Sequence, residues 1–222
     1  MQLGPVVKSR LARVFGLNVS LLERLMMRPM YSRDETAYSI CGSYNPLLVT
    51  KLVKNYRSHS ALLSLPSRLF YHKELLVCAD ERVASSLHNW EKLPKKGFPL
   101  IFHGLRVEKI RILLRSVDLP EIKVGSVEEF QGREYLAIII STVRSSEDHL
   151  NEDARYVVGF LSNPKRFNVA VTRPKALLIM VGNPHILIKD PCFGAFLEYC
   201  AMNGACVGCD LPPEIEVLQG CD

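Results

Sequence analysis

Residues 166–184 read RFNVAVTRPKALLIMVGNP and join a short amphipathic segment to an uninterrupted apolar run. Arg166 and Arg173 are seven residues apart, a spacing that puts both on one face of a helix, roughly 10 Å apart along its axis. The apolar residues between them can be buried, which would anchor the helix while both arginines point toward an anion. The alternative is an amphipathic helix whose arginines are simply solvated. The planar guanidinium suits phosphate oxygens. We predict a helix over 164–173 and a buried strand over 176–181.

Apolar runs and amphipathic segments alternate through the second half of the chain. Continuous Ile/Leu/Val runs separated by helices indicate parallel strands buried on both faces. The sequence therefore predicts an α/β fold, a three-layer α/β/α domain with a mainly parallel sheet, whose ligands bind beyond the carboxyl ends of the strands. Further strands are expected at 99–104, 122–124 and 136–141, and helices at 5–16, 20–28 (capped by Asn18 or Ser20), 46–53, 60–71 (interrupted by Pro66), 107–117 and 193–202.

Composition limits the classes of protein to consider. The chain has 222 residues, of which 48% are hydrophobic and 23% charged, which is ordinary for one globular domain or two small ones. A net charge of +5 permits a polyanionic partner but does not demand one. No apolar run approaches the roughly 20 residues of a membrane span, and no signal peptide is evident. We expect a cytoplasmic protein without a membrane segment.

The seven cysteines are scattered, and their odd count argues against a secreted disulfide framework. Cys206 and Cys209 form a CxxC pair, and Cys200 and Cys221 lie nearby in the sequence. A lone CxxC without a second matched pair is a weak zinc signal. We therefore predict no metal site and leave this cluster as the open alternative.

Three further motifs offer polar side chains to an anionic ligand. Ser126 and Glu129 read as a capping box, and the following QGRE, 131–134, reads as a tight turn that presents polar side chains to a cleft or simply to solvent. The strand at 136–141 ends in Thr142-Val143-Arg144, which suits backbone phosphates. Tyr56-Arg57 places an aromatic face beside a guanidinium, a pairing that can stack a base and hold a phosphate, or that simply ends a helix.

One apparent metal motif is rejected. Asp80-Glu81 follows an apolar run and resembles a magnesium-binding DE box. Such a box works together with a phosphate loop, and no G-x-x-x-x-G-K-[ST] occurs in the sequence. We interpret both residues as ordinary loop acids.

The order and spacing of these motifs resemble those of superfamily one helicases, specifically the Up-frameshift-like RNA helicases. Residues 56–57 resemble their motif IV region, 128–134 motif V and 166–173 motif VI, while 2–5 resemble the end of motif III. The resemblance covers nearly the whole chain, and the linked QGRE and VAVTR motifs are specific to it. An unrelated α/β domain is the alternative.

Within that group the chain most resembles the armitage-type helicases, in the stretches 44–52, 55–59, 159–168 and 208–213. Residues 65–72 and 172–175 favour the germline branch of the piRNA pathway over the ubiquitous, virus-restricting branch. The resemblance implies an ATP-dependent 5′-to-3′ RNA helicase that acts on piRNA precursor transcripts in germline transposon silencing. Spermatogenesis and meiosis are the expected setting, with cytoplasmic germline ribonucleoprotein granules as the location.

The resemblance also implies roles for individual residues. Arg173 would be the arginine finger, Arg57 would contact the terminal phosphate, and Tyr56 would pack against the nucleotide. Gln2 would sense the γ-phosphate, Glu134 would bind the ribose or order the magnesium site, and Gly132 belongs to the same ATP-binding motif. Arg166 has a weaker claim, either structural or RNA-facing. The residues expected to face the RNA backbone are Ser126, Thr142 and Arg144.

The resemblance further implies that the chain, 1–222, is one domain, the second RecA-like domain, with 1–5 the tail of the first. ATP and Mg²⁺ would be held mainly by that first domain, so this chain alone should not hydrolyse ATP. The family places a further helix and strand where Arg106 runs directly into Val107, so we predict a missing segment there. Expected partners are single-stranded RNA, the first RecA-like domain and piRNA-pathway proteins. A non-catalytic RNA- or protein-binding module and a DNA-directed helicase remain alternatives.

Overall fold

The computed structural model of the chain describes residues 3–5, 7, 9–104, 125–142, 163–208 and 210–215. The chain divides into two compact units, Gln2–Val53 and a larger one from Lys54 onward. The helix predicted at 107–117 and the strand predicted at 122–124 lie outside the described residues.

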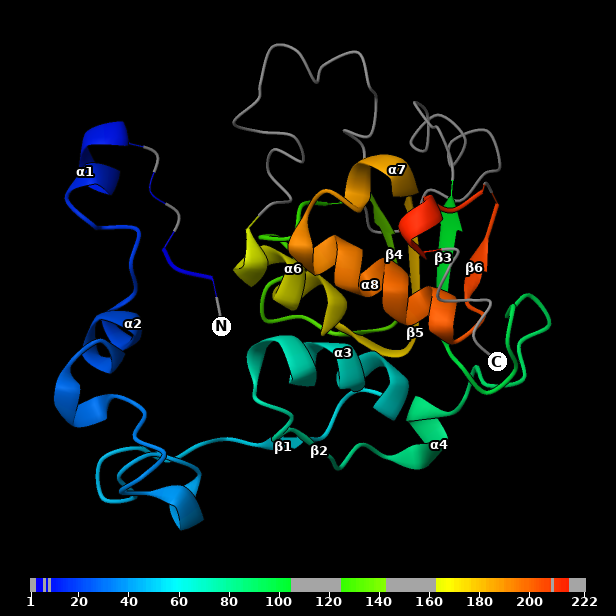
Figure 1. Cartoon of the computed structure of the whole chain (residues 1–222). Helices are drawn as coiled ribbons and strands as arrows, with labels where there is room; N and C mark the ends of the chain where they lie inside the picture. Colours follow the sequence, from blue (N-terminus) through cyan, green and yellow to red (C-terminus); the bar gives the residue numbers. More distant parts are fainter. Residues whose placement is uncertain are drawn as a thin grey trace. The chain divides into compact units, whose positions relative to one another are not determined.

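A four-stranded parallel sheet with the order β4-β5-β3-β6 forms the centre of the larger unit (Figure 1). Leu178 in the central strand pairs with Ile138 on one side and with Leu100 on the other. The α/β fold and the parallel sheet are thereby confirmed, while the short β6, inside the cysteine cluster, was not anticipated. The strands are β3 (Leu100–Gly104), β4 (Tyr135–Ser141), β5 (Pro174–Gly182) and β6 (Cys206–Val207).

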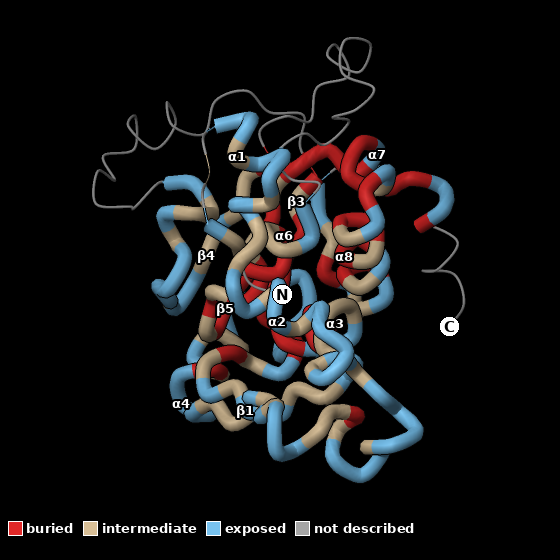
Figure 2. The backbone as a smooth tube through the Cα atoms, turned by 90° about the vertical axis from the view of Figure 1, so that its left-hand side faces the viewer, coloured by how far each residue is buried: buried red, intermediate tan, exposed pale blue. Residues whose placement is uncertain are grey.

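Three helices cover one face of this sheet: α3 (Ser60–Phe70), α6 (Pro164–Val171) and α8 (Pro191–Met202). Phe167 of α6 lies edge-on to Phe193 of α8, with ring centroids 5.0 Å apart. Figure 2 shows buried residues concentrated in β5, α6 and α8. The opposite face packs Leu177 and Ile101 against Leu93. Burial on both faces explains why β3 and β5 are continuously apolar, whereas β4 at the edge of the sheet leaves Leu136 and Ile139 exposed, so burial of that strand on both faces was wrongly predicted.

Proline positions account for two departures from the predicted helices. Helix α3 continues through Pro66, because the proline and its apolar neighbours are buried in the core and this packing outweighs the lost backbone hydrogen bond. Helix α6 ends at Val171 rather than at 173. A proline at 174 disfavours helical backbone at the residue before it, so Arg173 leaves the helix. The prediction that Arg166 and Arg173 share one helical face is therefore wrong.

Short elements complete the larger unit. β1 (Lys54–Asn55) pairs in parallel with β2 (Leu76–Val77). α4 (Glu81–Ala84) is capped by Asp80, whose carboxylate accepts a hydrogen bond from the backbone N–H of Arg82. This cap gives Asp80 a structural role and agrees with the rejection of the DE box. α7 (Pro184–Leu187) follows β5 directly.

The smaller unit contains α1 (Arg10–Val14), α2 (Leu21–Met26) and the 3-10 turns η1 (Pro29–Tyr31) and η2 (Ser39–Cys41). Ser20, not Asn18, caps α2. The helix predicted over 46–53 is wrong: the Asn45 side chain accepts from the backbone of Leu47 and closes a local turn that competes with a helix. Within the described residues, no helix is long and apolar enough to cross a membrane.

Candidate functional site

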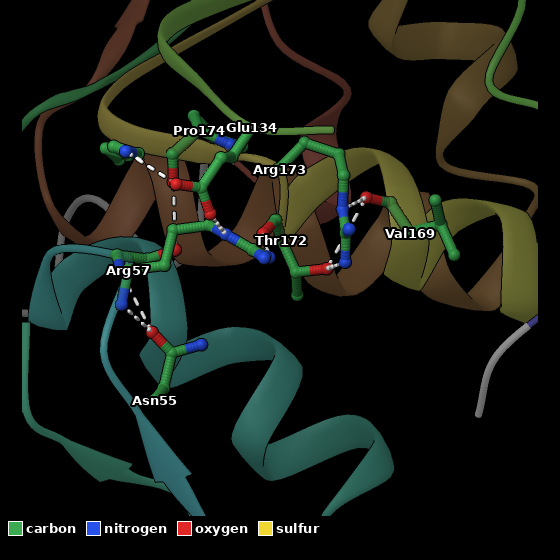
Figure 3. Close-up of polar contacts among 9 residues, drawn as sticks. Asn55, Arg57, Glu134, Val169, Thr172, Arg173 and Pro174 are labelled. Carbon is green, nitrogen blue, oxygen red and sulfur yellow. Dashed lines mark hydrogen bonds and ion pairs between the residues drawn. The ribbon is translucent and has the colours of Figure 1, made fainter. Parts of the chain in front are cut away.

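Residues 57–59 are held against the start of β5 and the residues just before it by three successive hydrogen bonds. Figure 3 shows the contacts of Arg57 in this region. Arg57 Nη1 donates to the carbonyl of Thr172 at 3.3 Å, and Ser58 Oγ donates to the carbonyl of Pro174 at 2.9 Å. The backbone N–H of His59 donates to the carbonyl of Lys175, also at 2.9 Å. Ser58 is only 1% exposed. The segment that carries Arg57 is therefore held firmly against the sheet.

Glu134 holds a cation on each carboxylate oxygen. Arg57 Nε lies 2.6 Å from its Oε2, and Lys175 Nζ lies 2.6 Å from its Oε1. The hydrogen bond from Lys175, followed by that from Arg57, lowers the pKa of Glu134 from its ordinary 4.5 to about 2. Glu134 is thus a carboxylate at any physiological pH.

Arg173 follows the end of α6 and lies near Arg57. Its Nε donates to the carbonyl of Val169 at 3.1 Å, and its Nη2 donates to the hydroxyl of Thr172 at 3.3 Å. Burial lowers the pKa of Arg173, and the nearby charge of Arg57 adds to that effect. Among the described residues no carboxylate forms an ion pair with Arg173. A half-buried cation beside a second cation is a site that an anion would stabilise.

This cluster lies at the amino-terminal edge of the sheet. Glu134 directly precedes β4, and Arg173 directly precedes β5; because the strands are parallel, both residues come to the same edge. The expectation that ligands bind beyond the carboxyl ends therefore does not describe this cluster. Thr142 follows the other end of β4, roughly 25 Å away along a strand that rises about 3.3 Å per residue.

Two more residues predicted to bind ATP border the cluster. Tyr56 is 69% exposed, so the residue is accessible to a ligand. Gly132 has φ +75°, a left-handed conformation that favours glycine, so its place in the motif has a conformational reason. Gln2 lies outside the described residues.

The 125–134 segment is a series of turns rather than the start of a helix. Ser126 Oγ donates to the Glu129 carboxylate at 3.4 Å, so the predicted capping box is present only as a side-chain contact. Arg166 Nε lies 2.7 Å from Glu128 Oε1 and ties α6 to these turns. This ion pair between Arg166 and Glu128 favours the structural role for Arg166. Ser126, at the start of the same turns, is exposed to solvent.

The structure describes two of the three residues predicted to bind RNA, of which Ser126 is exposed and Thr142 is buried. Thr142 is 2% exposed, and its hydroxyl donates to the carbonyl of Val181 at 3.1 Å. Its side chain packs so closely on Gly182 that a Cβ there would lie 2.1 Å from Thr142 Oγ1. Arg144 lies outside the described residues. The RNA-binding roles stay predictions, and Thr142 would have to rearrange to offer its hydroxyl.

Metal binding has little support in the described residues. They contain no group of three or more His, Cys, Asp or Glu side chains that could hold a metal ion. Cys200 is fully buried and hydrogen-bonded to Cys206, while Cys209 and Cys221 lie outside the described residues. Glu134, the acid of the cluster, is paired with Arg57 and Lys175, and its expected part in binding the ribose or ordering the magnesium site stays a prediction.

Sequence reasoning missed Lys175, Thr172 and Ser58. Lys175 stands two residues after Arg173, at the start of the strand, and this closeness in the sequence was the available signal. The carbonyl of Thr172 accepts from the distant Arg57, and the hydroxyl of Ser58 donates to the distant carbonyl of Pro174; a sequence carries no signal for such contacts.

The chain matches known proteins along nearly all its length. A family model described as an AAA domain matches residues 100–185. The chain is 61% identical to "RNA helicase Mov10l1" of Mus musculus over 99% of this chain and 23% of that protein. It is 61% identical to the Homo sapiens protein of the same name, over 100% of this chain and 22% of that protein. It is 34% identical to "Probable RNA helicase armi" of Drosophila melanogaster over 95% of this chain and 22% of that protein.

The chain thus spans less than a quarter of the length of these curated relatives. The match to the mouse protein runs over 269 residues whereas this chain has 222, so at least 47 positions of the match have no residue here. The junction of Arg106 and Val107 lies outside the described residues, and the missing segment there stays a prediction. The linked motifs, the parallel sheet and these matches together show that the chain belongs to the Up-frameshift-like superfamily one RNA helicases, on their armitage-type branch.

Proposed function

We propose that this chain is the second RecA-like domain of an ATP-dependent RNA helicase and supplies one half of a composite ATP site. The single observation that carries the proposal is the meeting of Arg57 and Arg173 at Thr172, a residue 115 positions from Arg57 along the chain. Two guanidinium groups at one residue form a cradle for a polyphosphate. The exposed ring of Tyr56 beside them offers a face for a nucleotide base.

Each group has a distinct part in the proposed hydrolysis. Arg57 binds the terminal phosphate and so positions it for attack by water. Arg173 neutralises the charge that develops on the transferred phosphoryl group, a contribution of about 10³ to 10⁵ in rate. Glu134 hydrogen-bonds the ribose hydroxyls. The phosphate loop and the magnesium ligands come from the first RecA-like domain, so this chain alone does not turn ATP over.

The proposed substrate is single-stranded RNA, along which the helicase moves 5′ to 3′. The printed names of the relatives, RNA helicases at 61% and 34% identity, support RNA as the partner. Action on piRNA precursors with piRNA-pathway proteins, in cytoplasmic germline granules, rests on the family resemblance. It is favoured over the role of the ubiquitous branch because identity to Mov10l1 is high.

The decisive experiment is Arg173→Ala in a full-length helicase that carries this chain. RNA-stimulated ATP turnover should fall about 10³-fold or more, while RNA binding, measured by fluorescence anisotropy, stays largely intact. The matched control is Arg166→Ala, which removes an arginine of the adjoining helix α6 that is paired with Glu128; its turnover should fall far less. Unchanged turnover in Arg173→Ala contradicts the arginine-finger role and favours a non-catalytic binding module.

A further inference from the structure

Three cationic side chains, those of Arg57, Arg173 and Lys175, lie in the candidate site, and the sequence pattern assigned no role to Lys175. Its Nζ lies 2.6 Å from Glu134 Oε1, on the opposite carboxylate oxygen from Arg57. Its side chain is 31% exposed, so the pair is accessible to a ligand that approaches this edge of the sheet. Lys175 is therefore a candidate for a part in the nucleotide site.

The backbone of Lys175 is fixed. The residue lies in β5, one position after its start, and its carbonyl accepts the hydrogen bond from the backbone of His59. The carbonyl of the preceding Pro174 accepts from the buried hydroxyl of Ser58. The same hydrogen bonds hold the segment that carries Arg57, so both cations are set at fixed positions around Glu134.

Charge balance shows why a second cation is needed. With Arg57 and Lys175 both engaged, Glu134 is well compensated. A nucleotide phosphate that draws Arg57 away would leave a bare carboxylate beside a polyanion, and like charges repel. A lysine is suited to remain paired with Glu134 when Arg57 moves, because its ammonium is a compact point charge that needs only one oxygen of the carboxylate.

We propose that Lys175 is a positioning residue that neutralises and orients Glu134, so that Arg57 can leave the carboxylate for the phosphates of a nucleoside triphosphate. This proposal rests on the proposed function of the domain. Lys175 itself acts through Glu134 and does not touch the nucleotide. Without Lys175, Arg57 is the remaining compensating charge of Glu134 among the described ion pairs and is held back from the phosphate.

The test is a double-mutant cycle in the full-length helicase. The variants are Lys175→Met, Lys175→Arg, Glu134→Gln and the double variant Lys175→Met/Glu134→Gln. Two quantities are measured: the Kd for a fluorescent, non-hydrolysable ATP analogue and the RNA-stimulated turnover. Lys175→Met should weaken analogue binding about tenfold, within the range typical of coupled contacting residues. Lys175→Arg should restore most of the affinity. Urea unfolding of each variant shows that the domain remains folded.

The cycle separates action through Glu134 from direct contact with phosphate. In the Glu134→Gln background, Lys175→Met should change the Kd less than about twofold, because there is no carboxylate left to neutralise. A tenfold loss in that background as well would overturn the proposal, since Lys175 would then bind the phosphate itself. An unchanged Kd in Lys175→Met alone would also overturn it. A wild-type helicase that neither binds the analogue nor hydrolyses ATP would instead refute the proposed function.

Discussion

Arg57 and Arg173 both donate hydrogen bonds to Thr172, one to its carbonyl and the other to its hydroxyl, each at 3.3 Å. In Figure 3 the side chain of Thr172 lies between the two guanidinium groups. The hydroxyl of Thr172 in turn donates to the carbonyl of Asn168 at 2.6 Å. One buried residue after the end of α6 therefore orients both arginines.

Replacing Thr172 by valine should disturb Arg173 without removing it. The substitution keeps the shape and deletes the hydroxyl, which costs about 1 kcal/mol of unfolding free energy for the lost hydrogen bonds. We expect kcat of RNA-stimulated ATP turnover in the full-length helicase to fall at least tenfold with little change in KM, because Arg173 acts in the transition state. Ser67→Ala is the control: it also loses a buried hydroxyl hydrogen bond, to the backbone of Leu75, away from the site. Equal effects of both variants on kcat would argue against a positioning role for Thr172.

The stability contributed by the ion pairs of Glu134 should depend on pH. Since the pKa of Glu134 falls from 4.5 to about 2 on folding, its contribution is complete above pH 4.5 and is lost as the pH falls toward 2. In urea unfolding, Glu134→Gln should be less stable than wild type at pH 6, with a difference that shrinks steadily at pH 4 and pH 3. The exposed Glu91→Gln is the control for a simple change of net charge. A difference that stays constant with pH would show that the ion pairs contribute nothing.

Acid should also weaken the packing of His59. Its Nδ1 accepts a hydrogen bond from the backbone of Ala61, and its Nε2 lies 2.7 Å from Nε2 of His88. Burial, and then the charge of His88, lowers the pKa of His59 below its ordinary 6.5. The neutral form is favoured in the fold, so stability is lost as the pH falls below about 6.5. His59→Asn keeps a capping oxygen and cannot titrate, so it should lose less unfolding free energy than wild type between pH 7.5 and 5.5.

Gly182 should not tolerate alanine. A Cβ at this position would lie 2.1 Å from Thr142 Oγ1 and 2.8 Å from Leu187 Cδ1, so neighbouring buried groups must move. We expect Gly182→Ala to cost about 1–3 kcal/mol of unfolding free energy, as for other overpacked cores. Adding Thr142→Ala, which removes the clashing oxygen, should recover part of that loss in thermal unfolding. Strictly additive losses would show that the contact with Thr142 is not the cause.

The central strand could be predicted because burial on both faces leaves a continuous apolar signature, as in Leu177–Met180. The edge strand β4 has the same apolar signature although Leu136 and Ile139 are exposed. The identities of Arg57, Glu134 and Arg173 came from motifs whose order resembles a known family. Their mutual contacts could not come from the sequence, because each partner is contributed by a different segment. The hydrogen bond between Ser58 and Pro174, for example, spans 116 residues.

Predictions of helix boundaries from local sequence were wrong where tertiary packing or a neighbouring proline had the larger effect. Pro66 breaks helices in isolation but stays within α3, because its ring is buried in the core. The helix predicted through Arg173 stops at Val171, because Pro174 restricts the residue before it. That two-residue difference bears on the proposed role of Arg173, because the residue lies outside the helix and donates to the hydroxyl of Thr172.

The hydrogen bond between Arg57 and Thr172 closes a span of 115 residues. Bringing such distant positions together carries a high entropic cost, which is repaid only when the intervening strands have assembled. A nascent chain on the ribosome that has emerged only as far as β4 contains Arg57 and Glu134 but lacks Thr172, Arg173 and Lys175. The pair of arginines at Thr172 is therefore absent from every shorter translation intermediate, and premature termination before β5 yields a product without it.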